Sequence, residues 1–160
     1  MGAKGICIAE ECHIVNLLPP IDITGGQWTD VFNMEGYSHA TIIIQAGVTA
    51  AAWTKIIVNE CIDATGHSGT ATAIAHSIYK CETASSDVLG ARTAVLAAGT
   101  TPSANNNIFY VIELDAAELT SGYNWVEISL TDAGNANLVS AVAILSGARY
   151  GMDQSPTVLA

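Results

Sequence analysis

The chain has 160 residues, of which 50% are hydrophobic and only 12% are charged. Disordered segments show the opposite composition, so we expect one domain with a packed core. The formal net charge is −10 at pH 7. Nucleic acids and anionic membranes are bound mainly through Lys and Arg, so we expect no nucleic acid and no membrane as a main partner.

The first residues contain two adjacent acids, Glu10 and Glu11, before any sustained apolar run. Secretory signals begin with a cationic stretch followed by an apolar stretch, and this start lacks that order. No segment approaches the roughly 20 apolar residues that a membrane helix needs. These features predict a soluble protein made in a cytoplasm.

Residues 1–36 show no sustained periodicity and are interrupted by Pro19-Pro20 and Gly25-Gly26. Such a segment alone buries little area, so we expect an extended N-terminal arm that is loose in the free protein. Its apolar side chains would suit a protein interface, because aromatic and Met side chains are favoured in interface cores. The alternative is that they pack on their own domain. The four residues concerned are Trp28, Val31, Phe32 and Met34.

From residue 40 onward, short runs rich in β-branched and apolar residues alternate with turn residues. No amphipathic helix separates these runs, which indicates antiparallel strands. We therefore predict an all-β domain at residues 37–150, an antiparallel β-sandwich or jelly roll of about 6–8 strands, followed by a C-terminal tail at 151–160. The expected strands are 40–46, 53–62, 70–81, 108–114, 123–130 and 138–148, with a weaker one at 88–97.

The strands at 53–62 and 70–81 are expected to form a hairpin around Gly66. This register places Val58 opposite Ile74 and Trp53 opposite Tyr79, both favourable cross-strand pairs.

The same register places Cys61 opposite about residue 71, too far from Cys81 for a disulfide unless the strands lie in different sheets. Free thiols are the expected state, although disulfides remain open. The cysteines are Cys7, Cys12, Cys61 and Cys81.

Catalytic and cofactor motifs are absent from the sequence, so we expect no enzyme, no cofactor and no metal. The Cys and His residues lack the paired close spacing of a structural zinc site. His67-Ser68 lies in a Gly-flanked loop and is interpreted as a solvated turn. Glu113 and Asp115 share one strand face and could in principle act as an acid and a base, but with no aromatic sugar platform nearby a solvated strand end is the preferred interpretation.

Four segments carry a resemblance to a known class of proteins: NLLPPIDITGG at 16–26, VFNMEGYSHATIIIQ at 31–45, NIFYVIELD at 107–115 and AVAILSGARY at 141–150. They resemble segments of head decoration, or cement, proteins and other small virion proteins of tailed bacteriophages. The resemblance implies a β-sandwich that lies on the outer surface of the head. It also implies binding to the major capsid protein and to sister subunits, as a homo-oligomer, either a dimer or a trimer. It transfers no functional residues.

Two other functions are open from the sequence. A carbohydrate- or receptor-binding module would use exposed aromatic rings, and Trp125 with Tyr123, or Trp53 across from Tyr79, are the candidates. A hydrolase on a β-sandwich is the third hypothesis, for which the sequence offers no nucleophile beside an evident base.

Overall fold

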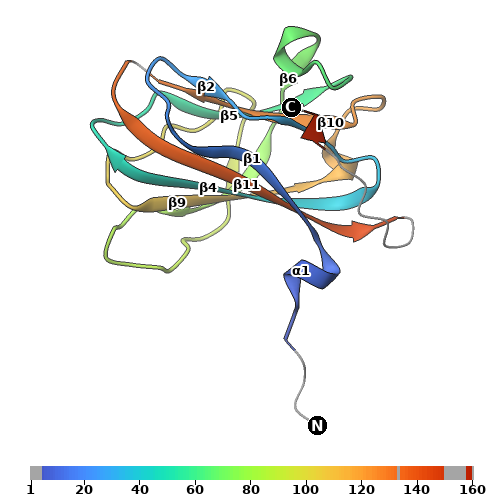
Figure 1. Ribbon diagram of the computed structural model, residues 1–160, viewed down its shortest axis with the longest axis horizontal. Coiled ribbons are helices and arrows are strands. Elements are labelled where there is room, and N and C mark those ends of the chain that lie inside the picture. Colours follow the sequence, from blue (N-terminus) through green and yellow to red (C-terminus); the bar gives the residue numbers. More distant parts are fainter. Residues whose placement is uncertain (1–4, 133, 150–157, 160) are drawn as a thin grey trace.

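A computed structural model describes residues 5–132, 134–149 and 158–159. In these residues the chain forms two six-stranded sheets that face each other as an antiparallel β-sandwich (Figure 1). The all-β prediction is confirmed, and the sheets contain more strands than expected. A short helix, α1 (Ile8–Glu11), precedes the first strand.

The first sheet has the strand order β1-β11-β4-β9-β7-β8. The long strands β4 and β11 pair along most of their length, and β9 pairs with the other edge of β4. Core positions alternate with outward positions, as the sequence period predicts. The bounds are β1 (His13–Asp22), β4 (Tyr37–Thr49), β7 (His76–Cys81), β8 (Thr93–Val95), β9 (Ile108–Asp115) and β11 (Asn137–Ala148).

The second sheet has the order β12-β3-β10-β5-β6, and β2 pairs with the same edge of β10 as β3. Thr29 lies between β2 and β3, and its hydroxyl accepts a hydrogen bond from the buried N–H of Ile128 at 2.9 Å. The two short strands therefore act as one interrupted strand along β10. The bounds are β2 (Gln27–Trp28), β3 (Val31–Asn33), β5 (Lys55–Cys61), β6 (Ala71–Ala73), β10 (Trp125–Thr131) and β12 (Val158–Leu159).

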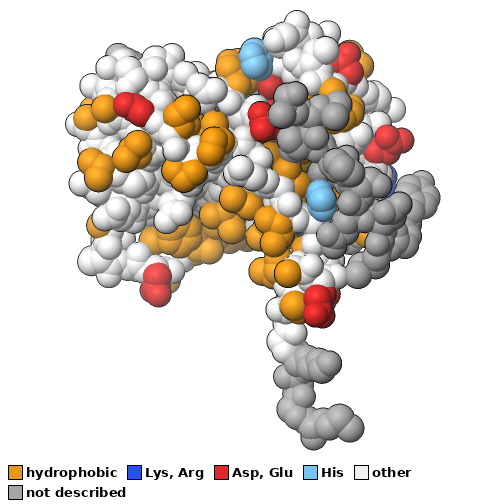
Figure 2. Space-filling view, viewed as in Figure 1, with side chains coloured by type: hydrophobic (Ala, Val, Ile, Leu, Met, Phe, Trp, Pro, Cys, Tyr) orange, Lys and Arg blue, Asp and Glu red, His pale blue; other side chains and the backbone are white. Residues whose placement is uncertain are grey.

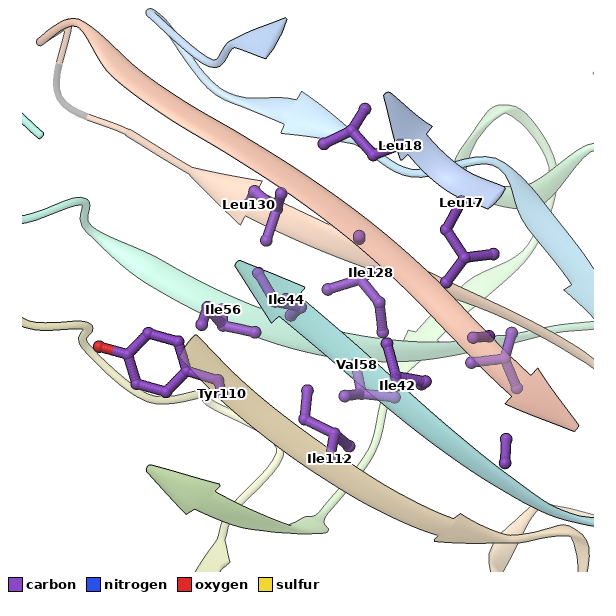
Figure 3. Packing of buried hydrophobic residues seen from close by; sticks show 14 of the residues in the cluster. Leu17, Leu18, Ile42, Ile44, Ile56, Val58, Tyr110, Ile112, Ile128 and Leu130 are labelled. Carbon is purple, nitrogen blue, oxygen red and sulfur yellow. The ribbon is translucent and has the colours of Figure 1, made fainter. Parts of the chain in front are cut away.

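The core lies between the sheets and consists mainly of aliphatic side chains (Figure 3). Ile42 and Ile112 from the first sheet point toward Val58 and Ile128 from the second. Each of these side chains is fully buried. Burial of one such side chain contributes roughly 1.5–3 kcal/mol, so the sandwich is stabilised chiefly by this layer.

The predicted N-terminal arm is wrong, because residues 13–33 belong to both sheets. His13 to Asp22 pair with β11, and the side chain of Leu17 is fully buried in the core. Pro19 and Pro20 do not prevent this, because β1 is an edge strand and its pairing shifts register between Leu18 and Ile21. The irregular register also explains why no sequence period was visible.

The predicted hairpin is confirmed only in its first half. Cys61 pairs with Ala71, and the N–H of Ile74 donates to the carbonyl of Val58 at 2.9 Å. After Ile74 the chain crosses to the first sheet, where β7 pairs with β9. The expected pair of Trp53 with Tyr79 is therefore wrong.

Trp53 instead lies fully buried with its ring edge-on to Tyr110, at 6.2 Å between centroids. Cys61 and Cys81 belong to different sheets, and both are free thiols. The predicted C-terminal tail falls mostly outside the described residues, but β12 pairs with β3.

Candidate functional site

The outward face of the first sheet carries a row of side chains across five strands, and all of them except Asn16 are apolar or aromatic. Asn16 begins this row at the edge, and cross-strand pairing continues it through Val142, Ile43, Val111 and Tyr79. Their neighbours along each strand point into the core, which fixes the outward direction of the row.

A second row lies beside the first on the same face. Ile14 pairs with Ile144, which pairs with Thr41, and Thr41 pairs with Glu113. Ile14 is 51% exposed. We define the apolar face as the outward side chains Ile14, Ile43, Phe109, Val111, Val142 and Ile144, together with Tyr79.

The apolar face distinguishes the first sheet from an ordinary solvent-facing sheet. Antiparallel sheets with one solvated face normally alternate apolar and polar residues, whereas β4, β9 and β11 place apolar residues on both faces. Hydrophobic side chains also gather on the surface over these strands in Figure 2. Of the seven side chains of the apolar face, Ile14 is exposed, Val111 is buried and the other five are partly exposed. A contiguous apolar surface is typical of interaction sites.

A polar cluster borders the apolar face where β4 begins and β9 ends. His39 Nε2 lies 2.6 Å from Glu113 Oε2, and His39 Nδ1 lies 2.7 Å from Asp115 Oδ1. The hydroxyl of Thr41 donates to the same Glu113 oxygen at 2.7 Å. The imidazole therefore joins two carboxylates, and both of its nitrogens are engaged.

The sequence left open whether Glu113 and Asp115 form an acid and base pair or a solvated strand end. They do share one face, as predicted, but the ring of His39 links them instead of leaving two independent acids at a solvated strand end. With both ring nitrogens engaged, His39 has no free lone pair to accept a proton from a substrate.

The contacts of the His39 ring shift its pKa. Burial of the ring lowers its pKa, but the hydrogen bonds to Asp115 and Glu113 outweigh this effect, so the pKa is raised above the ordinary 6.5. Since the folded pKa is the higher one, the stabilising contribution is complete below pH 6.5 and is lost as the pH rises through the folded pKa.

We predict that His39→Gln removes this pH-dependent part of the stability. The difference in unfolding free energy between native protein and variant should be largest in mild acid and shrink as the pH rises past the folded pKa of His39. Denaturant unfolding at several pH values, with an NMR titration of the ring, measures both quantities. A ring that titrates below 6.5 would contradict the prediction.

A second cluster lies on the outward face of the second sheet. The carboxylate of Glu127 on β10 is nearly inaccessible, with 2% of its side chain exposed, and its Oε2 lies 3.1 Å from His67 Nδ1. No described residue bonds the buried Oε1. His67 in turn stacks on Trp28, at 4.4 Å between ring centroids.

A 3-10 turn, η1 (Gly66–Ser68), covers this carboxylate. Gly66 has a φ of +56°, and a Cβ there would lie 2.5 Å from Glu127 Oε2. Only glycine permits so close an approach in this conformation. Burial, followed by the charge of Glu127, raises the pKa of the neighbouring Cys61 thiol to about 12. A thiol held protonated is a poor nucleophile.

The predicted interface residues are mostly part of the core. Val31, Phe32 and Met34 are buried within their own domain, which confirms the alternative interpretation and corrects the prediction that they anchor a partner. Trp28 is partly exposed and contacts His67. The apolar face could not be predicted from the sequence, because the outward residues of distant strands are known to be neighbours only once the register between those strands is known.

The aromatic platforms proposed for a glycan are only partly present. Trp53 is fully buried and is not a platform. Trp125 is half-buried at the start of β10, with Tyr123 in the preceding turn.

Among the described residues, no group of three or more His, Cys, Asp or Glu side chains has the geometry of a metal site. Within the same residues, no helix has the length and apolar character to cross a bilayer.

Fold and surface together define an antiparallel β-sandwich with one apolar outward face bordered by a histidine-carboxylate cluster. Neither a scan against protein-family models nor a search of curated proteins found a match. Among solved structures, the chain is similar to the crystal structure of SPBc2 prophage-derived protein YomS, with 14% identity and a TM-score of 0.45. The match covers 90% of this chain and 99% of that chain. A similarity at this level assigns neither a family nor a function.

Proposed function

We propose that this chain is a structural virion protein that decorates and stabilises a bacteriophage head. In this proposal it lies on the outer surface and binds the major capsid protein and sister subunits. The observation that carries the binding role is the apolar face of the first sheet. The phage setting is supported by the resemblance of its segments to head decoration proteins.

The apolar face suits a broad protein partner better than a small ligand. Its central row runs across five neighbouring strands, from Asn16 to Tyr79, and therefore presents a wide surface of adjacent side chains. Full burial of an exposed aliphatic side chain contributes roughly 1.5–3 kcal/mol, and each partly exposed side chain of this face would contribute part of that when covered. Several such residues at the centre of an interface are enough to support stable association.

The charge of the chain agrees with a position outside the shell. A net charge of −10 disfavours contact with packaged nucleic acid, since such contacts rely on cationic side chains. A sister subunit would bind through a symmetric interface, and cyclic dimers and trimers are common solutions.

No catalytic step is part of the proposal. His39 has both ring nitrogens engaged, and burial keeps the thiol of Cys61 protonated. Both features fit a protein that acts by binding.

The test uses purified phage heads that lack this protein, to which native chain or variants are added. Ile43→Lys places a charge at the centre of the apolar face and should weaken head binding by about tenfold or more. Co-sedimentation with the heads measures the bound fraction. Ile14→Ser, at a more exposed position of the same face, is a milder second variant.

Thr72→Lys is the matched control, because it adds the same charge at an exposed position of β6 in the other sheet. It should bind like the native chain. Native-like unfolding curves for all variants would exclude loss of the fold as the cause. If folded Ile43→Lys and Ile14→Ser both bind heads normally, the apolar face is not the contact surface.

A further inference from the structure

A polar depression of about 390 Å³ lies beside the histidine-carboxylate cluster. Three separate parts of the chain meet there: the β4-β9 pair, β7 with Tyr79, and the segments that carry Arg92 and Glu118. Its volume falls in the range of small-molecule sites, roughly 300–1,000 Å³. It is distinct from the apolar face in character, since charged and hydroxyl-bearing side chains line it.

Hydrogen-bonding capacity remains open in this depression. Glu113 uses Oε2 for both His39 and Thr41, and no described residue bonds its Oε1. Glu118 uses Oε2 for the backbone N–H of Asp115, which likewise leaves its Oε1 open among the described residues. Arg92 lines the depression without an ion pair to any described residue. Acceptors and donors are therefore both available.

The charges in the depression select the kind of ligand. An anion would meet three carboxylates, from Glu113, Asp115 and Glu118, while a cationic side chain would meet the guanidinium of Arg92. A divalent cation would have to displace His39 from its two carboxylates. A neutral ligand with several hydroxyl groups avoids each of these conflicts.

A sugar could form hydrogen bonds with the open groups of the depression. A sugar hydroxyl donates to an open carboxylate oxygen and accepts from a guanidinium N–H. Tyr79 supplies a partly exposed aromatic side chain at the edge of the depression, suited to contact with the C–H groups of a sugar ring. The volume accommodates one sugar unit of a longer glycan.

We propose that this depression binds a neutral sugar unit, in which Glu113 and Glu118 accept and Arg92 donates hydrogen bonds. The site adjoins the apolar face, with which it shares Tyr79, but the sugar proposal does not rest on the proposed capsid role. It also lies on other strands than Trp125, the aromatic platform that the sequence suggested.

The test is an NMR titration of the native chain with four neutral probes, D-glucose, D-galactose, L-rhamnose and N-acetyl-D-glucosamine. At least one should shift the amides of His39, Tyr79 and Asp115 saturably. Glu113→Gln and Arg92→Met should each weaken that binding by about tenfold or more, because a hydrogen bond to a charged group is lost. Arg92 lies outside the strands and the core, so its substitution leaves the fold intact.

Glu10→Gln, in the exposed helix α1, is the matched control and should leave sugar binding unchanged. N-acetyl-lysine methylamide and N-acetylneuraminic acid serve as cationic and anionic probes. Stronger shifts with either charged probe would overturn the proposal. So would the absence of saturable shifts with all four neutral sugars, or sugar binding that persists unchanged in both site variants.

Discussion

Replacing Phe32 with alanine is expected to lower the free energy of unfolding by about 3–5 kcal/mol, the usual effect of removing a large buried aromatic side chain. Phe32 is fully buried, and its strand β3 pairs with both β10 and β12. The substitution would therefore leave a cavity in the core and loosen the edge of the second sheet. Urea denaturation followed by tryptophan fluorescence measures the change.

Ile14→Ala is the control, because that side chain is 51% exposed and points away from the core. Its effect should stay within about 1 kcal/mol. Hydrogen exchange on the free protein adds an independent measurement, in which the paired amides of β1 should be protected like those of β4. A Phe32→Ala variant as stable as the native chain, with rapid exchange throughout β1, would restore the loose arm that the sequence suggested.

Replacing His67 with alanine is expected to destabilise the protein by about 1–3 kcal/mol, because it leaves the buried carboxylate of Glu127 without its partner. The exposed fraction of His67, 44%, keeps the effect below that of a fully buried ion pair. Loss of the stacking contact with Trp28 adds to it.

A double-mutant cycle with Glu127→Gln separates the two contributions. If the buried charge is the cause, Glu127→Gln should cost less in the His67→Ala background than in the native chain, with a coupling of about 1 kcal/mol. Ser68→Ala, at an exposed position of the same turn, should change stability by no more than about 0.5 kcal/mol. Strictly additive effects of the two substitutions would show that the contact between His67 and Glu127 does not contribute to stability.

The strands of the sandwich could be predicted where a run of residues carries its own period. β4 and β9 alternate core and outward residues along their length, so their positions follow from the residues themselves. The Cys61 register was also predictable, because the loop at 62–70 is centred on Gly66 and residues equally far from that centre face each other across the hairpin. Local information is enough in these cases.

The arm and the crossing after Ile74 could not be predicted in the same way. Leu17 is buried because β11 lies beside it, and that pairing joins the two ends of the described chain. Pro19-Pro20 is typical of a loop, yet an edge strand tolerates it. A sequence also does not show which of the two sheets a strand joins, so Tyr79 was assigned to the wrong partner.

In the candidate site, the shared face of the two carboxylates could be predicted from the sequence, but their contact with His39 could not. Glu113 and Asp115 are two residues apart on one strand, and their shared face follows from the period of two. His39 reaches them only because β4 pairs with β9, and the two ring contacts span 74 and 76 residues of sequence. Such a contact has no local signal.

The position of β1 beside β11 has a consequence for how the protein forms. Asp22 and Asn137 are bonded partners, yet 115 residues separate them along the chain. During synthesis, β1 leaves the ribosome long before the strand that will hold it exists. Folds dominated by such distant pairings form in roughly milliseconds to seconds. Completion of the first sheet therefore waits for the last long strand, and Leu17 stays without its final neighbours until then.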